Sequence, residues 1–425
     1  MVKLENTPLF GNDSSTDASS KFAGCSDIRV GETAQCFPVE FIGPRPLLVC
    51  FSHLRWSFVW QRPQHLLSRA AKQFDILFIE EPVFEFAPVE RLRVEAVAPG
   101  IQVAVPILRE TERQNADQSQ ERLIRGHLDG LQSRKRIFWY YTPAAMGFSG
   151  NLARDLTLYD NMDELSAFRG ASPELVAQEA ELFAQADLVF TGGLSLFEAK
   201  RDCHTNIHCF PSSVDAAHFA QARHPECPDP ADQAAIPQPR LGFFGVIDER
   251  FDRALTAAIA ELRPDWHLIM IGPVVKIDPA TLPKRPNIHW LGPKTYSELP
   301  NYLCHWDVGL MPFAINEATR FISPTKTPEF LAAGLPLIST PIVDVVRSYG
   351  EDGLVEIAQT PVAAVLAAEA LMARPKEPWL LQVDRRLAKG SWDRTWQSMH
   401  ALIQAKMGRP ASAQTTAARP ALSSS

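Results

Sequence analysis

A lysine and a glutamate three positions apart, Lys326 and Glu329, are the residues of this chain best suited to bind an anionic ligand that also carries hydroxyl groups. They follow Pro324 and precede an apolar stretch that stops at Gly334, a pattern typical of a short helix. The first amides of a helix lack intrahelical partners and attract anions, and Lys326 adds a full positive charge. The Glu329 carboxylate can accept bonds from a sugar diol. A ligand with a diphosphate next to a ribose would use both the positive charge and the carboxylate.

The same pattern also fits an ordinary surface helix with a lysine–glutamate pair, and residue chemistry alone leaves both interpretations open. Beyond Gly334, the apolar run 335–338 is closed by Ser339, Thr340 and Pro341. Such a run is typical of a central strand in a parallel sheet, so the pattern predicts a helix followed by a buried strand.

Residues 324–336 read Pro-x-Lys-x-x-Glu-x-x-Ala-x-Gly-x-Pro. This run resembles the nucleotide-sugar motif of GT-B glycosyltransferases, especially the retaining enzymes of family four. The resemblance implies that Thr325, Lys326 and Glu329 bind a nucleotide-sugar donor. It places Glu329 at the position of the glutamate that holds the donor ribose.

The chain departs from this motif at one position. The family pattern has a first glutamate eight residues before Glu329, and Phe321 stands there in this sequence. Glu317 is the nearest acidic residue, and we expect it to substitute for the first glutamate through a longer loop.

The composition limits the class of protein. A chain of 425 residues is long enough for two domains, and a hydrophobic content of 46% can fill their cores. The net charge of −7 argues against general nucleic-acid binding. Seven cysteines are an odd and sparse set, which favours a reducing cytosol over a disulfide framework. Cys203, His204, His208 and Cys209 lie across an expected strand, so they predict no metal site.

The sequence predicts a cytoplasmic protein, with peripheral contact to the inner face of the membrane left open. Residues 1–6 lack the apolar core of a signal peptide, and no apolar run is long enough to cross a bilayer. Basic clusters at 134–136 and between Arg55 and Lys72 fit either a solvated face or a membrane-facing patch. Residues 1–40 and 407–425 are rich in small and polar residues, and we expect both to be disordered.

Apolar runs that alternate with helical patterns predict an α/β fold with parallel sheets. The first domain, 41–223, has expected strands at 46–51, 76–79, 137–141, 156–159 and 188–191. Five prolines in residues 224–239 predict a linker. A second domain, 240–406, has expected strands at 241–247, 268–271, 288–291 and 308–311, and a closing helix over 390–403. We therefore expect two Rossmann-like, doubly wound domains facing a cleft, which is the GT-B architecture.

In open α/β sheets, ligands bind beyond the carboxyl ends of the strands. Gly245 follows one expected strand and lets the backbone approach a ligand closely. Arg250 could pair with a diphosphate, or with a neighbouring acid such as Glu249 or Asp252. Asp163 follows a strand of the first domain and could orient hydroxyl groups of the donor or acceptor.

His53, Arg55 and Trp56 follow the first strand and predict an acceptor-binding wall. A tryptophan at such a place is more often a core residue than a sugar platform. The sequence leaves both interpretations of Trp56 open.

The chain combines His-Leu-Arg-Trp and Gln-Arg-Pro-Gln-His within 53–65, Tyr-Asp-x-Met-Asp-Glu at 159–164, and Phe-Pro-Ser-Ser-Val-Asp at 210–215. With this combination, residues 45–405 resemble a bacterial subgroup of these transferases that is linked to cell-surface polysaccharide synthesis. The resemblance implies transfer of a sugar from a nucleoside diphosphate sugar to a glycan or lipid-linked acceptor, with retention and with no metal or other cofactor. Asp163, Lys326 and Glu317 are then the catalytic candidates. Without a metal ion, the negative charge on the departing diphosphate must be stabilised by Lys326, Arg250 and helix amides.

Three other functions stay open. A nucleotide-sugar 2-epimerase on the same fold would consume a nucleotide sugar without an acceptor. A non-catalytic sugar-nucleotide-binding subunit fits the replacement of the first motif glutamate by Phe321. A two-lobed ligand receptor is disfavoured because the sequence begins without a signal peptide.

Overall fold

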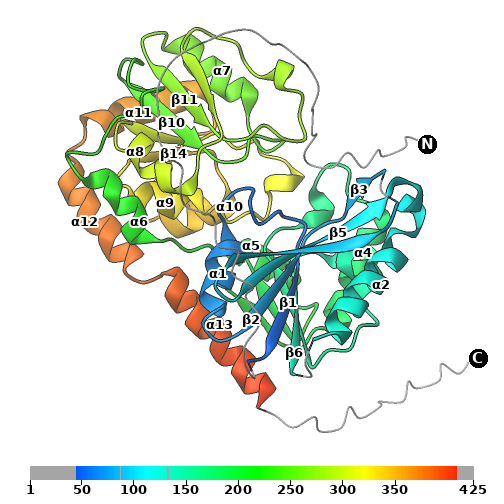
Figure 1. Cartoon of the computed structure of the whole chain (residues 1–425). Coiled ribbons are helices and arrows are strands. Elements are labelled where there is room, and N and C mark those ends of the chain that lie inside the picture. The colour runs from blue at the N-terminus through cyan, green and yellow to red at the C-terminus, as the bar shows by residue number, and fades with distance from the viewer. Residues whose placement is uncertain (1–44, 87, 132–133, 409–425) are drawn as a thin grey trace, which may run out of the picture.

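The protein folds into two α/β domains, each built on a mostly parallel sheet (Figure 1). The computed structural model describes residues 45–86, 88–131 and 134–408. The prediction of disorder for 1–40 lies outside these residues, and so does that for the tail 407–425, except for Met407, which ends the last helix, and Gly408. The expected fold class, two doubly wound domains of the Rossmann type, is confirmed.

The N-terminal sheet has nine strands in the described part of the chain, in the order β3-β5-β2-β1-β6-β7-β8-β9, with β4 paired to β5. Its central strands are buried on both faces because nearly every side chain in them is apolar. The strands are β1 (Leu47–Phe51), β2 (Asp75–Ile79), β3 (Val83–Glu85), β4 (Arg91–Ala98), β5 (Ile101–Arg109), β6 (Arg136–Tyr140), β7 (Leu156–Asn161), β8 (Leu188–Thr191) and β9 (Ile207–Cys209).

The sequence patterns missed β3, β4 and β5, and the expectation of an all-parallel arrangement is wrong for β4, which runs antiparallel to β5. Side chains of β4 are mostly exposed and charged residues are frequent in it, so it lacks the apolar run that marks the central strands. Such an edge strand is fixed by its pairing with β5 rather than by its own composition.

Two groups of helices cover the N-terminal sheet. One face carries α1 (Arg62–Ala70) and α13 (Trp392–Met407), and the other carries α2 (Ala116–Asp129), α3 (Met146–Ser149) and α4 (Pro173–Gln185). A short helix, α5 (Leu194–Lys200), follows β8. The sheet core therefore lies between two helical layers, as in other doubly wound folds.

The C-terminal sheet has six parallel strands in the described residues, in the order β12-β11-β10-β13-β14-β15. Its strands are β10 (Arg240–Phe244), β11 (His267–Ile271), β12 (Ile288–Gly292), β13 (Val308–Met311), β14 (Leu337–Ser339) and β15 (Glu356–Ile357). One face is covered by α7 (Arg253–Leu262) and α11 (Pro361–Ala373). The other carries α6 (Ala216–Ala220), α8 (Leu299–Leu303), α9 (Lys326–Ala332) and α12 (Lys376–Leu387), and α10 (Val343–Val345) follows β14.

The last helix, α13, which was expected as a closing helix over 390–403, lies on the N-terminal domain, so the chain returns there from the C-terminal domain (Figure 1). Ser391 caps its start by accepting a bond from the Arg394 amide at 3.2 Å. Trp392 and Trp396 are buried in the core beside α1. The apolar face of α13 thus packs on the N-terminal domain.

The domain boundary lies earlier than the sequence suggests. Val214 and Phe219 are buried in the core of the C-terminal domain, although both fall within the predicted N-terminal domain, 41–223. The predicted linker, 224–239, is packed against the same domain. Its Gln233 side chain is fully buried and accepts a bond from Trp306 Nε1 at 2.7 Å. The prolines therefore shape a packed segment, and the chain crosses between domains before residue 214.

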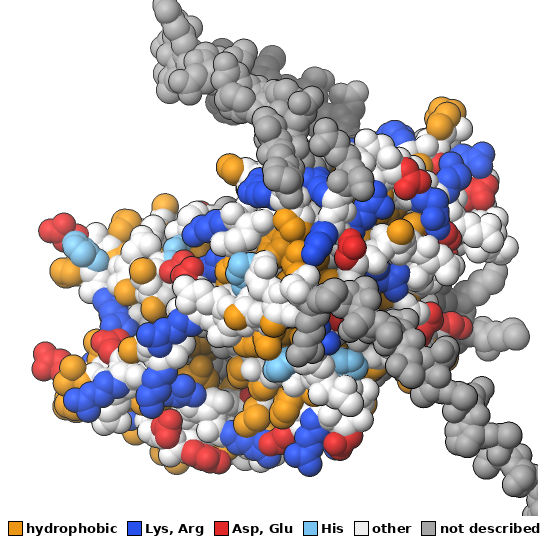
Figure 2. All heavy atoms as spheres, turned by 90° about the horizontal axis from the view of Figure 1, so that it is seen from below, with side chains coloured by type: hydrophobic (Ala, Val, Ile, Leu, Met, Phe, Trp, Pro, Cys, Tyr) orange, Lys and Arg blue, Asp and Glu red, His pale blue; other side chains and the backbone are white. Residues whose placement is uncertain are grey.

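Within the described residues, none of the helices combines the length and apolar character needed to cross a bilayer. The face drawn in Figure 2 carries side chains of both charges, interspersed with apolar ones.

Candidate functional site in the interdomain cleft

A cavity of about 1110 Å³ lies between the two domains, beyond the carboxyl ends of strands from both sheets. Its C-terminal wall includes Gly245 after β10, Gly272 after β11, and Lys326 and Glu329 on α9. Its N-terminal wall includes Arg55, Trp56, Trp60, Glu80, Val83, Phe84 and Arg93. The cavity occupies the place where open α/β sheets bind ligands.

Two glycines bring the loops after β10 and β11 together at the floor of this cavity. Gly245 has φ +143, and a Cβ there would lie 3.2 Å from Lys326 Cε. Gly272 has φ +144, and a Cβ there would lie 1.7 Å from the Gly245 carbonyl oxygen. Both positions favour glycine because side chains rarely adopt these angles, and at Gly272 a Cβ would also collide with the backbone. Gly245 was predicted at this site, whereas Gly272 was not.

The predicted lysine and glutamate do lie on the first turn of α9, facing the cavity. Lys326 Nζ is 3.1 Å from Thr325 Oγ1, to which it donates, and 3.4 Å from Glu329 Oε2. The same ammonium lies 5.2 Å from the centre of the Phe244 ring. Lys326 is thus held at the cavity wall by three weak contacts, with its side chain 18% exposed.

Glu329 is the most unusual group of the site. It is 2% exposed, and its Oε2 forms no hydrogen bond within the described residues, although the ion pair with Lys326 lies beside it. Burial raises the pKa of Glu329 to about 7, and the charge of Lys326 opposes that rise. Burying a carboxylate oxygen without a hydrogen-bond donor costs free energy. A ligand with hydroxyl or amide groups would supply the missing donor.

A smaller cavity of about 120 Å³ shares Gly245 and Lys326 with the larger one. It is lined by Asp163 from the loop after β7, by Arg250 and by Lys326, together with Gly245 and Thr325. The structure therefore unites four of the predicted donor residues, all except Glu329, with Asp163, which comes from the other domain.

Arg250 pairs with Asp248 rather than with Glu249 or Asp252. Its Nε lies 3.1 Å from Asp248 Oδ1, and its Nη2 lies 2.7 Å from Asp248 Oδ2. Burial raises the pKa of Asp163 to about 6; the positive charge of Arg250 opposes the rise, and the negative charge of Asp248 adds to it. The small cavity is thus lined by three cations, Arg62, Arg250 and Lys326, and by one carboxylate, Asp163.

The N-terminal wall of the large cavity is held by Glu80. Arg55 Nη1 donates to Glu80 Oε2 at 2.8 Å and to the Glu81 carbonyl oxygen at 2.7 Å. The Trp56 amide donates to Glu80 Oε1 at 2.8 Å. The Trp56 ring packs edge-on against Phe78 at 5.2 Å, so it is partly a core residue while it lines the cavity. Arg55 and Trp56 are therefore brought to the cleft, as predicted.

His53 and Glu317 are not among the residues that line either cavity. Burial lowers the pKa of His53 to about 4, and the charge of Lys276 contributes to the decrease. The Glu317 side chain is 78% exposed and lies 3.6 Å from Arg320. Asn316 caps this short turn by accepting from the Thr319 amide, which directs Glu317 to solvent. The expectation that Glu317 replaces the first motif glutamate is therefore not supported by its position.

Other residues of the site escaped the sequence analysis. Asp248 lies two positions before Arg250, but Glu249 and Asp252 are at least as close, so the sequence does not single it out. Glu80, Lys294 and Tyr296 carry no local signal, because their place in the cavity depends on how strands and loops meet. Within the described part of the chain, no group of three or more His, Cys, Asp or Glu side chains is arranged to hold a metal ion.

Residues 238–374 match the family described as Glycosyl transferases group 1, and they coincide with most of the C-terminal domain. This part of the chain is therefore a domain of the glycosyl transferases group 1 type. Over 103 residues the chain is also 34% identical to TuaH of Bacillus subtilis (strain 168), a protein whose name assigns it to teichuronic acid biosynthesis as a glycosyltransferase. That alignment spans 24% of this chain and 26% of the relative, about a quarter of each.

Solved structures resemble the whole fold. A sucrose-phosphate synthase from Thermosynechococcus elongatus superposes with a TM-score of 0.61 at 12% identity, over 85% of this chain and 99% of that one. A trehalose-6-phosphate protein from E. coli, solved with bound UDP-2-fluoro glucose, superposes with a TM-score of 0.61 at 13% identity, over 86% and 99% of the two chains. At such identities the likeness shows the fold, which is GT-B.

Proposed function

We propose that this chain is a GT-B glycosyltransferase that moves a sugar from a nucleoside diphosphate sugar to a glycan or lipid-linked acceptor, with retention. The observation that carries the proposal is the Glu329 carboxylate. It is 2% exposed, lines the cleft beside Lys326, and has an Oε2 without a hydrogen-bond donor in the described residues. The hydroxyl groups of a ribose would supply those donors.

The donor would be held by groups from the C-terminal domain. Lys326 lines both cavities and Arg250 lines the smaller one, so both can neutralise a diphosphate placed between the cavities. Gly245 lets the backbone approach that diphosphate. A UDP-sugar as donor is supported by the E. coli structure of the same fold, which was solved with UDP-2-fluoro glucose.

Transfer breaks the bond between the anomeric carbon of the sugar and the diphosphate oxygen, and forms a bond from that carbon to an acceptor hydroxyl oxygen. Negative charge develops on the leaving diphosphate, where Lys326 and Arg250 would stabilise it. The acceptor hydroxyl gives its proton to the departing diphosphate oxygen, and Asp163, in the smaller cavity, would orient that hydroxyl. No metal or other cofactor is needed in this scheme. Retention is included because the motif resembles that of family four.

The acceptor would enter along the wall that contains Arg55 and Trp56, which line the large cavity from the N-terminal domain. A role in cell-surface polysaccharide synthesis is supported by the similarity to TuaH, whose name assigns it to teichuronic acid biosynthesis. A lipid-linked acceptor would place the protein in the cytoplasm, at the inner face of the membrane.

The first test is calorimetric titration with UDP, GDP and ADP, followed by mass spectrometry of donor hydrolysis and transfer, all in excess EDTA. Lys326→Met should weaken binding of the preferred nucleotide by about ten- to a hundred-fold, because it removes a charge-assisted bond. An enzyme that turns over only after magnesium or manganese is restored would contradict the metal-independent part of the proposal.

Glu329→Gln and Glu317→Gln form a matched pair for the ribose contact. Glu329→Gln should impair donor use, because an amide offers one acceptor oxygen where the carboxylate offers two. Glu317→Gln changes an exposed group that lines neither cavity, so turnover should stay unchanged. A larger loss from Glu317→Gln would show that the proposed donor site is wrong.

A further inference from the structure

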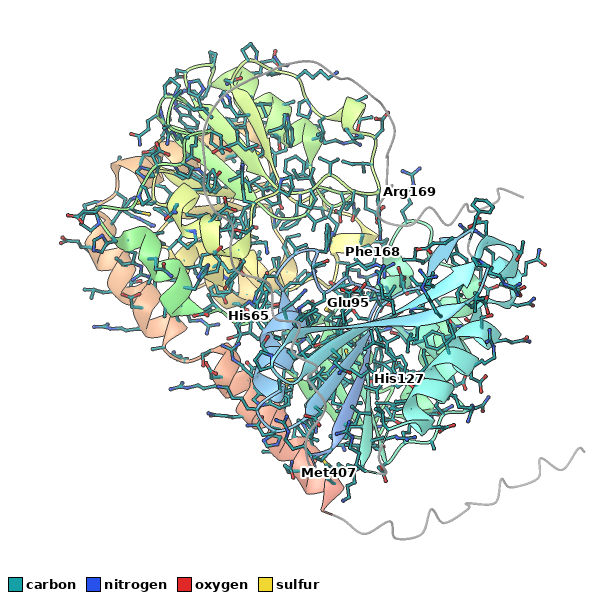
Figure 3. All side chains as sticks on the ribbon, viewed as in Figure 1. His65, Glu95, His127, Phe168, Arg169 and Met407 are labelled. Atoms are coloured by element: carbon teal, nitrogen blue, oxygen red, sulfur yellow. The ribbon has the colours of Figure 1, made fainter. Side chains whose placement is uncertain are left out.

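The loop after β7 reaches across the cleft and contacts the C-terminal domain. Phe168 in this loop has Arg250 Cζ 5.3 Å from its ring centre and Lys276 Nζ 5.4 Å from it. The next residue, Arg169, donates its amide to Glu249 Oε1 at 3.0 Å. Figure 3 shows Phe168 and Arg169 where the two domains face each other. One aromatic ring of the N-terminal domain thus meets two cations of the C-terminal domain.

Arg250 is contacted by two side chains that belong to different domains. Asp248, two positions before it, accepts from Nε and Nη2, which occupies one edge of the guanidinium. Phe168 approaches the same guanidinium from the opposing domain. Arg250 itself lines the smaller cavity with Lys326 and Asp163. The group best placed to meet a diphosphate there is therefore fixed partly by the partner domain.

An aromatic ring has an effect on Arg250 that a second carboxylate would not have. The negative face of a ring attracts a guanidinium, yet the ring carries no net charge. Asp248 pairs directly with Arg250, and Asp163 and Glu249 add weaker negative fields, so a further carboxylate in place of the ring would offset still more of the charge available to an anionic ligand. A phenyl ring holds the side chain in place and leaves that charge in the cavity.

We propose that Phe168 is a positioning residue for Arg250, and that it acts only when the two domains are together. In this arrangement the ring restricts the arginine so that its charge is directed at the donor diphosphate. When the domains separate, Arg250 keeps Asp248 but loses the ring, and its affinity for the leaving group falls. The assignment rests on the proposed function, because it needs a diphosphate in the smaller cavity.

Phe168→Leu and Phe168→Tyr separate the aromatic contact from simple packing. Both keep a bulky apolar side chain, but only tyrosine keeps a ring. Phe168→Leu should lower kcat/KM for the donor by roughly two- to thirty-fold, the range expected for loss of a cation–π contact. Phe168→Tyr should restore it to within about two-fold. Tyr349→Leu removes a ring 5.2 Å from Arg386 that lines neither cavity, and donor turnover should stay unchanged.

An Arg250→Met background tests whether the ring acts through the arginine. In that background Phe168→Leu should cause no further loss, since the cation it positions is gone. Equal kcat/KM for wild type and Phe168→Leu, or the same loss in both backgrounds, would overturn the inference while leaving the proposed function intact. A wild-type chain that binds and turns over no nucleoside diphosphate sugar would instead overturn the proposed function, and the inference with it.

Discussion

Glu329 shows how far burial alone can change the chemistry of one residue. Its pKa is raised by burial from 4.5 to about 7, although Lys326 lies 3.4 Å away and opposes the rise. The carboxylate therefore loses more from leaving water than it regains from this cation. A ligand that donates hydrogen bonds to the carboxylate would compensate for its lost hydration. The free energy that burial of Glu329 costs in the free protein would then be recovered when the ligand binds.

This raised pKa predicts a pH-dependent stability of the free protein. Between pH 4.5 and about 7 the folded state keeps a proton on Glu329 that the unfolded state has lost. The free energy of unfolding should therefore fall as pH rises through this window, by up to ~3 kcal/mol from this group, and the penalty should stay constant above it. Chemical denaturation from pH 4.5 to 8 measures the change.

Glu329→Gln provides the comparison for that prediction, because an amide does not titrate. The difference in stability between Glu329→Gln and wild type should grow in favour of the variant as pH rises from 4.5 to 7. Glu317→Gln, whose carboxylate is exposed, should follow the wild-type curve. Parallel curves for all three proteins would mean that Glu329 titrates normally.

At the scale of elements, one helix is capped by the opposite domain. The first residues of α5 donate their amides to Asp344 of the C-terminal domain, Leu194 to Oδ2 and Ser195 to Oδ1, each at 2.9 Å. Gly193 makes room for this contact, since a Cβ there would lie 2.3 Å from Asp344 Oδ2. The helix start thus depends on a carboxylate that the N-terminal domain does not contain.

Asp344→Ala should lower stability by about 0.5–2 kcal/mol, as expected for a lost helix cap, and should also loosen the domains. Thr360→Ala is the matched control, because Thr360 caps α11 by accepting from Ala363 within one domain. Both variants should melt earlier, but only Asp344→Ala should increase the radius of gyration in small-angle scattering. An unchanged radius for Asp344→Ala would show that the cap adds stability without holding the domains together.

At the scale of the whole molecule, the two domains contact each other close to the segment where the chain passes from one to the other. Ser212 Oγ donates to the Ser323 carbonyl oxygen at 2.6 Å, next to the motif that contains Lys326. The chain crosses before residue 214 and returns before α13, which begins at Trp392. Because 224–239 is packed on the C-terminal domain, bending for domain closure is expected at these two crossings rather than in that segment.

Binding of UDP should favour the closed arrangement, because closure places Phe168 on Arg250 and expels water from the diphosphate. The radius of gyration in small-angle scattering should therefore be smaller at saturating UDP than in the free protein. Phe168→Leu should show a weaker decrease at the same nucleotide saturation. Identical profiles with and without UDP would mean that the cleft is already formed in the free protein.

The sequence alone determined the features that depend on neighbouring residues. The central strands were predicted because their side chains are apolar on both faces, a property visible in short runs such as Leu47–Phe51. The three-residue spacing of Lys326 and Glu329 fixes their relation on α9, because side chains that far apart lie on one face of a helix. The fold class and the placement of the lysine–glutamate pair on one helix followed from such local patterns.

Only the tertiary structure decided which distant segments share a cavity. Glu317 was excluded by the turn that Asn316 caps, which leaves its side chain exposed. Asp163 was placed beside Arg250 by how the two domains pack, which has no local signal. The exposed strand β4 and the packed segment 224–239 were missed for the same reason, because partners elsewhere in the chain stabilise them. Packing between elements depends on which faces meet in space, whereas the sequence of one element shows only its own residues and their spacing.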